Sequence, residues 1–340
     1  MATLRDVARL AGVSIGTASS ALNQGRKVKD ITRRKVLEAA SVLNYRPNGV
    51  ARDLKTQRTD TIVVFLHDLA GPFYSELIRG IQSVADERGY ATIISRGGVG
   101  RQIAWTRFVV EGRVDGAIVL DPTVPDEVIR STACSTLPIV LLDRTLATPY
   151  CLHVAADHED GAYQITKHLL LSGLRRIAFV SGPIDSHDSS LRFRGYHKAL
   201  SEFGINIDET LVFRGDFTER SGLLAARAIL SHENLPEGIF AANDEMALGV
   251  LSGCEASGIK VPDQVAVVGF DDIAIASYVR PALTTVRQPM YELGGVAARS
   301  LFRAIDGEQD VSSQVLPTTL VVRDSSKRPS VNDTPMAQSV

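Results

Sequence analysis

The stretch VSIGTASSALNQG, residues 13–25, is built almost entirely from small side chains and lies near the start of the chain. Ala18, Ala21 and Leu22 recur in it at helical spacing, so they predict the buried side of a short helix that Ser14 can cap. The outward face of this helix then consists of Ile15, Gly16, Ser19, Ser20 and Asn23. Such a face lets the helix backbone come close to a partner.

The segments on either side predict two further helices. Thr3 can cap a helix that ends at Gly12, because glycine readily adopts the left-handed conformation found at helix ends. Thr32 can cap a third helix, which ends at the Tyr45-Arg46-Pro47 segment because the residue before proline disfavours helix. Two short helices joined by a tight turn form a helix-turn-helix, whose second helix lies in the DNA major groove. The alternative is a helical hairpin that packs against protein.

Charge is distributed unevenly along the 340 residues. Residues 1–60 hold twelve Lys or Arg and five Asp or Glu, a net charge of +7, whereas the remaining residues sum to −9. A basic head on an acidic body indicates a polyanionic partner for the head alone, and it weakens the hairpin alternative. A solvated charged surface would produce the same asymmetry without any partner.

The sequence argues against several other classes of protein. No apolar run reaches the roughly 18 residues needed to span a bilayer, and the N-terminus lacks a secretory apolar region. Cys134, Cys151 and Cys254 are too few and scattered for a disulfide framework, so a cytoplasmic protein with no membrane partner is expected. The chain shows no metal-ligand spacing, no nucleotide loop and no GxSxG motif. We therefore expect no metal, no cofactor and no enzymatic activity.

Beyond residue 60, the chain alternates apolar, strand-like runs with helical segments. The strand candidates are TIVVFL, YATIIS, GAIVL, PIVLL, RIAFVS, GIFAA, VAVVGF and TTLVV. The helical segments include 73–88, 157–172, 189–203, 218–231 and 244–257. Apolar strands separated by helices predict parallel sheets covered on both faces, and the length suits two doubly wound lobes.

Polar residues are expected at the carboxyl ends of these strands, where doubly wound sheets bind ligands. They are Asp143, Arg144, Arg192, Asn243, Asp244, Asp271 and Asp272. The simpler role for Asp244 and Asp272 is to cap helices. The simpler role for Arg192, and for Arg194 beside it, is a surface ion pair. Carboxylates accept pairs of hydroxyl hydrogens, while Arg and Asn donate to hydroxyl and ring oxygens, so the set suits a sugar.

Several motifs of the chain resemble one known family. In the head they are TLRDVARLAGVS, TASSALN, YRPN and NGVARDLKT; in the body they include HLLLSGLRRIAFVSGP, AANDEMALGVL, VPDQVAVVGFDDI and LTTVRQPMYELG. They look like the lactose/galactose repressor (LacI/GalR) family of bacterial transcription regulators, over nearly the whole chain to about Asp324. The resemblance implies an all-α helix-turn-helix head and an α/β core like the periplasmic sugar-binding proteins, with two doubly wound parallel-sheet lobes.

The pattern and the resemblance together predict the domain boundaries. The helix-turn-helix head spans 1–47, a hinge helix and linker span 48–59, and the effector-binding and dimerisation core spans 60–327. Each lobe of the core is built from two stretches: about 60–156 and 287–316 for the first, and about 157–286 and 317–327 for the second. The Ser- and Pro-rich tail 328–340 is expected to be disordered.

The resemblance implies a bacterial, nucleoid-associated homodimer that binds double-stranded operator DNA. The DNA-contacting positions of the family correspond here to Ser14, Ile15, Gly16, Ser19, Ser20, Asn23, Tyr45, Asn48, Ala51 and Leu54. In the family the short hinge helix forms on the operator, and its leucine, here Leu54, wedges between base pairs. The family normally has Arg where this chain has Ser20, so the family's usual operator is not expected.

The resemblance also implies an effector site. Arg192, Asn243 and Asp271 match ligand-contacting positions of the family. The aromatic residues Phe73, Tyr74 and Phe217 match positions that wall its pocket, although they also suit an ordinary core, and Asp143 joins them from its strand end. The predicted function is a repressor whose operator affinity is controlled by a small, sugar-like effector. The alternative effector is a nucleoside, a purine or a phosphorylated metabolite, and the alternative function is a cytoplasmic sugar-binding protein or a glycosidase.

Overall fold

The structure, a computed structural model, describes residues 2–22, 28–46, 58–69, 71–97, 102–308 and 312–327. The chain forms two compact units, Met1–Thr59 and Asp60–Val340. Among the described residues, the first unit contains helices only, and every strand belongs to the second.

The first unit contains α1 (Leu4–Ala11), α2 (Ile15–Leu22) and α3 (Asp30–Val42). Thr3 caps α1 and forms a reciprocal capping box with Asp6, and Gly12 ends the helix at φ 65°, as predicted. The three helices share a small apolar core, which consists of Val7, Ala8, Ala18, Ala21, Val36, Ala39 and Ala40. The tight turn between α1 and α2 confirms the predicted helix-turn-helix.

The predicted cap of α3 is wrong. The helix begins at Asp30 after Lys29, which makes no side-chain capping bond, so Thr32 lies inside the first turn. The Asp30 carboxylate favours this earlier start, because a negative charge is stabilised at a helix N-terminus. The helix also ends earlier than predicted, at Val42, with Asn44 in the left-handed conformation at φ 48°. Asn44, rather than the later proline, therefore ends it.

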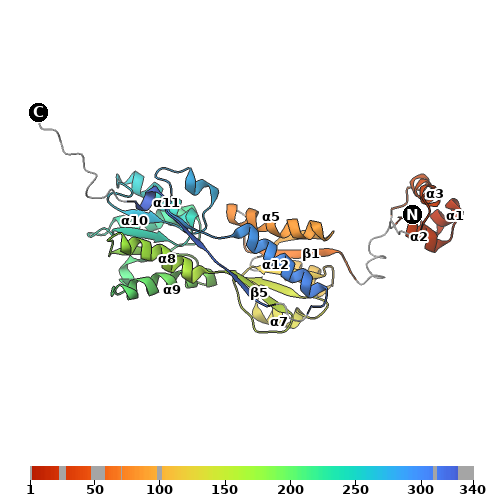
Figure 1. Ribbon diagram of the computed structural model, residues 1–340, viewed down its shortest axis with the longest axis horizontal. Helices are drawn as coiled ribbons and strands as arrows, with labels where there is room; N and C mark the ends of the chain where they lie inside the picture. The colour runs from red at the N-terminus through yellow and green to blue at the C-terminus, as the bar shows by residue number, and fades with distance from the viewer. Residues whose placement is uncertain are drawn as a thin grey trace, which may run out of the picture. The chain divides into compact units, whose positions relative to one another are not determined.

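The second unit contains a six-stranded sheet that is parallel throughout, as predicted. Its strand order is β11 (Gln314–Leu316), β5 (Cys151–Ala156), β4 (Ile139–Leu142), β3 (Gly116–Leu120), β1 (Thr61–Leu66) and β2 (Ala91–Arg96). Two helices lie side by side over one face (Figure 1): α5 (Pro72–Glu87) and α12 (Met290–Ile305). Three further helical elements contribute to another apolar cluster with strands of this sheet, through residues such as Trp105 and Ile129. They are α6 (Gln102–Trp105), the π-helical turn η1 (Thr106–Val110) and α7 (Asp126–Thr132).

A second parallel sheet has four strands. Its order is β7 (Val212–Arg214), β6 (Ile177–Ser181), β8 (Gly238–Ala241) and β9 (Ala266–Val268). Four helices pack against it as two pairs (Figure 1): α8 (His158–Leu171) with α9 (His187–Glu202), and α10 (Glu219–Leu230) with α11 (Asp244–Ala256). One continuous apolar core, which includes Phe179, Phe240 and Tyr196, joins the sheet to these helices.

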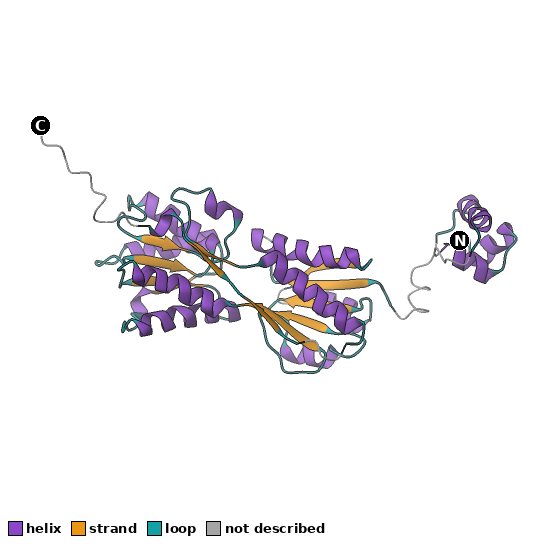
Figure 2. Cartoon of the chain, viewed as in Figure 1, coloured by secondary structure: helices purple, strands orange, loops and turns teal. Residues whose placement is uncertain are grey.

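A short antiparallel ribbon pairs β10 (Thr285–Arg287) with β12 (Thr319–Val321). The sequence predicts β12 as a strand of a parallel sheet, and this is wrong, because it pairs antiparallel with β10. The chain passes between the two larger sheets after β5, before α12 and after β11 (Figure 2). Three 3-10 turns complete the described elements: η2 (Glu209–Leu211), η3 (Ala274–Ser277) and η4 (Asp324–Ser326). Among the described helices, none combines the length and the apolar run that crossing a bilayer requires.

Candidate functional site

Helix α2 presents the outward face that the sequence predicts. Ala18 and Ala21 are buried in the head core, whereas Ile15 is 45% exposed and Gly16 and Ser20 are exposed as well. No residue of Ile15–Leu22 is charged, so this face offers a partner small apolar groups, hydroxyls and a closely approachable backbone.

The other predicted head residues fall into two groups. Ser14 caps α2, as predicted, because its hydroxyl accepts a hydrogen bond from the Thr17 amide at 3.1 Å. Ser19 and Tyr45 are half-buried. The remaining four lie outside the described residues: Asn23, Asn48, Ala51 and Leu54.

Arg192 is the centre of a second candidate site. It lies on α9, is only 3% exposed, and stacks its guanidinium over the Phe270 ring, 4.1 Å from the ring centroid. Its Nη1 donates a hydrogen bond to the backbone oxygen of Ala242, just after β8. The surface ion pair considered for Arg192 is therefore wrong. Arg194, two residues along the helix, is exposed and pairs with Glu159, as predicted.

Two carboxylates face the Arg192 guanidinium. Its Nη2 lies 3.6 Å from Oδ1 of Asp271 and 3.5 Å from Oδ2 of Asp188. Burial raises the pKa of Asp271 to about 6, although Arg192 and a hydrogen bond from Gln288 act in the opposite direction. Burial also disfavours ionisation of Asp188, but the Arg192 charge and local hydrogen bonds outweigh it and keep the pKa of Asp188 below its ordinary value.

Asn243 links the Arg192 region to Phe217. It caps α11, accepting a hydrogen bond from the Met246 amide at 2.9 Å, and its Nδ2 donates to the Phe217 backbone oxygen at 3.0 Å. The Phe217 ring lies 5.7 Å from the central guanidinium carbon of Arg192. The cap and the amide contact therefore hold Asn243 beside Phe217, which in turn lies next to Arg192.

The predicted capping roles of Asp244 and Asp272 are both wrong. Asn243 already caps α11, and Asp244 is a fully buried carboxylate that accepts hydrogen bonds from the Ile273 amide and the Thr285 hydroxyl. Burial, and then the nearby Asp271 charge, raise the pKa of Asp244 well above its ordinary value. Asp272 pairs instead with two arginines, at 2.7 and 2.6 Å: Arg287 and Arg323.

His158 connects Asp143 to the Arg192 region. Its Nδ1 lies 3.4 Å from both Nε and Nη2 of Arg192, which are nitrogens that only donate. Its Nε2 lies 2.9 Å from Oδ1 of Asp143, although the two groups are not aligned for a hydrogen bond. The Asp143 carboxylate is itself held by the Ala156 amide, which donates to it at 3.1 Å.

Phe73 and Tyr74 open α5, at the carboxyl end of β1. Their rings meet edge to face with centroids 5.3 Å apart, and Phe73 packs against the apolar cores of both larger sheets. Burial raises the pKa of Tyr74 well above its ordinary value, and the nearby charges of Asp188 and Asp271 add to this effect. The structure thus brings all seven predicted effector-site residues into one neighbourhood, which we call the Arg192 cluster.

Three members of the cluster have an unusual backbone conformation. The φ angles of Asp143, Phe217 and Asp271 are 52°, 68° and 121°. A non-glycine residue with positive φ costs of order 1–3 kcal/mol, and it persists where the surrounding structure holds it in place. Such residues concentrate at functional sites, which favours a binding role for the cluster.

Sequence reasoning missed three members of the Arg192 cluster. His158, Asp188 and Gln288 contact Arg192 or Asp271, but none stands directly after a strand that the sequence predicts. A signal was present for Asp188, which precedes Arg192 by one helical turn on α9. The Gln288 amide oxygen is buried without a hydrogen-bond partner, which leaves an acceptor beside Asp271.

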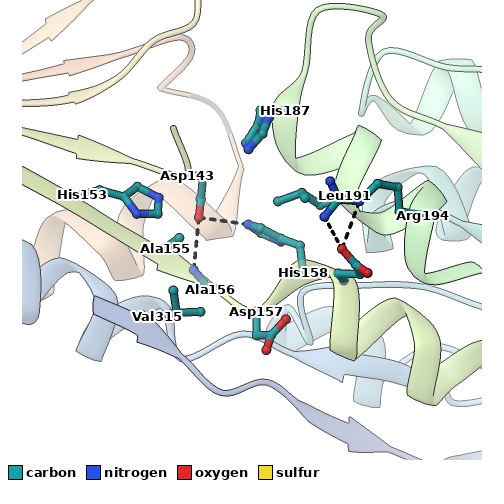
Figure 3. Close-up of a pocket in the computed structure, with 11 residues that line it drawn as sticks. Asp143, His153, Ala155, Ala156, Asp157, His158, His187, Leu191, Arg194 and Val315 are labelled. Atoms are coloured by element: carbon teal, nitrogen blue, oxygen red, sulfur yellow. Dashed lines mark hydrogen bonds and ion pairs between the residues drawn. The ribbon is translucent and has the colours of Figure 1, made fainter. Parts of the chain in front are cut away.

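A pocket of about 160 Å³ lies beside the cluster, and we call it the histidine pocket after His153, His158 and His187. Its walls come from β5, α8, α9 and β11, with Asp143 directed toward His158 (Figure 3). Burial lowers the pKa of His153, while the Asp143 charge opposes this shift. Among the described residues, no group of three or more His, Cys, Asp or Glu is arranged to hold a metal ion.

Two family models match parts of the chain, and their ranges contain α2 and Arg192. The model of bacterial regulatory proteins of the lacI family matches residues 3–48, and that of the periplasmic binding protein-like domain matches residues 166–326. Catabolite control protein A of Priestia megaterium is 37% identical over 329 residues, which cover 96% of this chain and 99% of that protein. The chain belongs to the lacI family of bacterial regulatory proteins.

Solved structures of lacI-family regulators resemble this chain over nearly its whole length. The Lac repressor dimer bound to operator and the anti-inducer ONPF has a TM-score of 0.84 at 34% identity, covering 96% of this chain and 99% of that one. The complex of the transcriptional regulator CelR with cellobiose has a TM-score of 0.72 at 35% identity, covering 96% and 100%. As a lacI-family member, the chain is a DNA-binding transcriptional regulator that responds to a small molecule.

Proposed function

We propose that this lacI-family chain is a homodimeric repressor whose operator affinity is controlled by a neutral sugar bound at the Arg192 cluster. The observation that carries the proposal is the composition of the cluster, in which buried carboxylates, one guanidinium and aromatic rings converge from both larger sheets. It follows that the chain acts at the bacterial nucleoid, in the cytoplasm, and that it is not an enzyme.

Charge favours a neutral effector over a phosphorylated metabolite. Asp188 and Asp271 face Arg192 at 3.5 and 3.6 Å, and the buried Asp244 lies close enough to Asp271 to interact with it. A phosphate would add negative charge where carboxylates already outnumber the one guanidinium, and burying like charges together is costly. A sugar instead presents hydroxyl hydrogens to the carboxylates and to the unpartnered Gln288 oxygen.

The aromatic members support the same ligand class. Phe217 lies beside Arg192, and Tyr74, which meets Phe73 edge to face, is close enough to Asp188 and Asp271 to feel their charges. Aromatic rings pack well against the apolar face of a pyranose. A purine could also stack on these rings, so a nucleoside or purine base is the second candidate. The solved CelR complex holds cellobiose, which favours the sugar.

The position of the cluster supports control of DNA binding. Tyr74 and Asp143 follow strands of the six-stranded sheet, whereas Arg192 and Asp271 belong to the part built on the four-stranded sheet. A ligand that contacts both parts favours one arrangement of the two lobes over another. By linkage, an effector that weakens operator binding must itself bind more weakly to the operator complex.

For the head, we propose DNA contacts by the exposed face of α2 together with the predicted residues outside the described ranges. Ser20 and Gly16 lack the long side chains that reach a guanine edge in two places, so the operator differs from one read by arginine at that position. Asn23, Asn48 and Ala51 are proposed to contact DNA, and Leu54 to wedge between base pairs of the minor groove.

The experiment that tests this function has two steps. The full chain is used to select duplexes from a random library, and neutral sugars, nucleosides, purine bases and phosphorylated sugars are then added to the selected complex. Release by one neutral sugar is the expected outcome. Failure to enrich any sequence would contradict the repressor function, and release only by a purine or a phosphorylated compound would replace the sugar. Turnover of glycosides by the purified protein would favour the glycosidase instead.

Replacing Arg192 by alanine should weaken sugar binding by about ten- to a hundred-fold, since losing a hydrogen bond to a charged group costs roughly 1.5–3 kcal/mol. The matched control is Arg194→Ala, on the same helix, because an exposed ion pair contributes little. Calorimetry with the releasing sugar measures both variants, after thermal unfolding has shown that each is folded. Operator binding without effector should survive in both, and equal sugar affinities would exclude Arg192 from the site.

Sugar affinity should also depend on pH through Asp271, whose pKa burial raises to about 6. Above that pH the carboxylate is ionised and accepts hydroxyl hydrogens, whereas below it the added proton removes part of this capacity. Between pH 7 and pH 5 the affinity should fall about tenfold, the change in the ionised fraction of one such group. Asp271→Asn should flatten this profile in calorimetric titrations. An affinity that rises with acid would contradict the role of Asp271 as acceptor.

A groove on the second lobe supports the homodimer. It has a volume of about 490 Å³, and its lining includes the partly buried Leu248, Leu251, Ile259, Val261 and Val279, the exposed Ile275, and the charged Glu219, Glu255 and Arg280. Ile275 is 46% exposed, and Tyr278 beside it is exposed even more. Exposed apolar side chains at such a groove are typical of protein interfaces, and the solved Lac repressor relative is a dimer. We therefore assign this groove, which we call the η3 groove, to the contact with a second copy of the chain.

A further inference from the structure

We propose that His158 is the residue that positions the Arg192 guanidinium, and that it does so as the neutral imidazole with its proton on Nε2. This assignment rests on the proposed function only in calling Arg192 an effector contact. It concerns a side chain that the sequence did not single out. It assigns a role to the residue that both contacts Arg192 and lines the histidine pocket.

The tautomer follows from the partners of the two ring nitrogens. Nε and Nη2 of Arg192 both lie 3.4 Å from Nδ1 of His158, and a guanidinium has hydrogens to donate but no lone pair to offer. Nδ1 must therefore accept, so it carries no proton. A neutral imidazole then holds its proton on Nε2, which faces the carboxylate of Asp143 at 2.9 Å.

Both ends of this contact chain are fixed by backbone. The Asp143 carboxylate accepts a hydrogen bond from the Ala156 amide at the end of β5, and Nη1 of Arg192 donates to the Ala242 carbonyl after β8. His158 lies between them as the first residue of α8. The imidazole therefore lies in a line of contacts that joins the guanidinium to the backbone at the ends of β5 and β8.

A third contact holds the pair in the remaining direction. Arg192 stacks on Phe270 at 4.1 Å, and the His158 ring lies 5.9 Å from the same ring, tilted by 36°. The Phe270 ring and Nδ1 of His158 therefore contact the guanidinium from two different directions. His158 adds a hydrogen-bond acceptor in a fixed direction. Because the guanidinium is planar, this acceptor keeps Nη2 turned toward Asp188 and Asp271.

Substitutions at His158 separate this role from simple packing. His158→Gln keeps a carbonyl oxygen that can accept from Arg192, whereas His158→Phe keeps a ring of similar shape without any acceptor. The matched control is His197→Gln, at an exposed histidine on α9 that contacts Ser201. Circular dichroism melting confirms which variants are folded before any comparison is made.

The readout is nuclear magnetic resonance of the full chain labelled with nitrogen-15 in its histidine rings and arginine side chains. The histidine signal lost in His158→Gln identifies His158, and it should show the Nε2–H tautomer. The Nε–H signal of Arg192, identified by its loss in Arg192→Lys, should be sharp in wild type, in His158→Gln and in the control. It should be lost to solvent exchange in His158→Phe, because the guanidinium is no longer held.

Two results would overturn the assignment: a proton on Nδ1 of His158, or an Arg192 Nε–H signal that is unchanged in His158→Phe. If His158→Phe does not fold, the tautomer in the wild-type protein still decides. No effector or operator enters the experiment, so its failure leaves the proposed repressor function untouched. Equally, a failed effector screen does not bear on the tautomer.

Discussion

A fragment that begins at Asp60 should remain folded and dimeric, bind sugar, and lose all specific operator binding. The chain divides into compact units at this residue, and the helix-turn-helix and its small core lie entirely on the other side of the division. Specific protein–DNA complexes are typically about 10³–10⁷ tighter than non-specific ones, so a loss of at least about a thousandfold is expected. Mobility shift with the selected operator measures this loss.

Two controls accompany that measurement. Thermal unfolding of the fragment with and without sugar should show the stabilisation that ligand binding produces. The full chain should lose operator affinity steeply as salt rises, because the basic head releases counterions from the phosphates it contacts. If the fragment still shifts the operator, the core contacts DNA, and the assignment of DNA binding to the first unit alone is contradicted.

Ile275→Arg in the η3 groove should convert the dimer into a monomer and weaken operator binding by about 10²–10⁴-fold. The long charged side chain would occupy the groove where a second copy packs, and it would have to be desolvated there, which disfavours association. A monomer engages one half-site at a time and so forfeits the gain that joining two binding units provides, typically about 10²–10⁴. Sedimentation equilibrium gives the mass, and mobility shift gives the affinity.

The matched control places the same charge elsewhere. Leu171 ends α8, is 70% exposed, and does not line the groove. Leu171→Arg should leave both the dimer and the operator affinity unchanged, because a charge there stays in water. A dimeric Ile275→Arg variant would show that the η3 groove is not the interface, while leaving the other proposals in place.

The head could be predicted from sequence in most of its detail because its signals are local. A capping hydroxyl at Thr3, a glycine at the end of α1 and helical spacing of small apolar residues each act within a few positions. The predicted end of α3 lies too late in the chain, and the error at its start comes from giving the Thr32 hydroxyl precedence over the favourable charge of Asp30. Both residue types favour helix N-termini, and their order along the chain does not decide between them.

The sheets could be predicted where strands are long and buried, and less well where they are short. β1 and β3 read as continuous apolar runs, whereas β7, β10 and β11 have three residues each and take their conformation from pairing with distant strands. β5 was not predicted, for another reason. Its run CLHVAA contains His153, which lines the histidine pocket and interrupts the apolar pattern.

The strand-end pattern indicates part of the candidate site, and it does not indicate His158, Asp188 or Gln288, which stand elsewhere in the chain. Asn243 and Asp271 follow buried strands, so topology alone brings them together. His158 contacts Arg192 from α8, through a packing of α8 against α9 that no local pattern encodes, whereas Asp188 contacts it from one turn earlier on α9 itself. Helical spacing places Arg192, unlike Arg194, on the same face of α9 as the buried Tyr196 and Ala199, but it does not identify the partners of a buried guanidinium.

The left-handed backbone of Asp143, Phe217 and Asp271 bears on how a new effector specificity could evolve. Asparagine and glycine tolerate positive φ best, and an aspartate codon becomes either of them by a single base change. A phenylalanine codon reaches neither in one step, so every residue that a single base change introduces at Phe217 tolerates this backbone less well than asparagine or glycine would. Mutational libraries intended to retarget the regulator should therefore leave Phe217 unchanged and restrict both aspartates to Asp, Asn and Gly. Full randomisation is better spent on Tyr74 and Asp188, whose helical backbones accept most side chains.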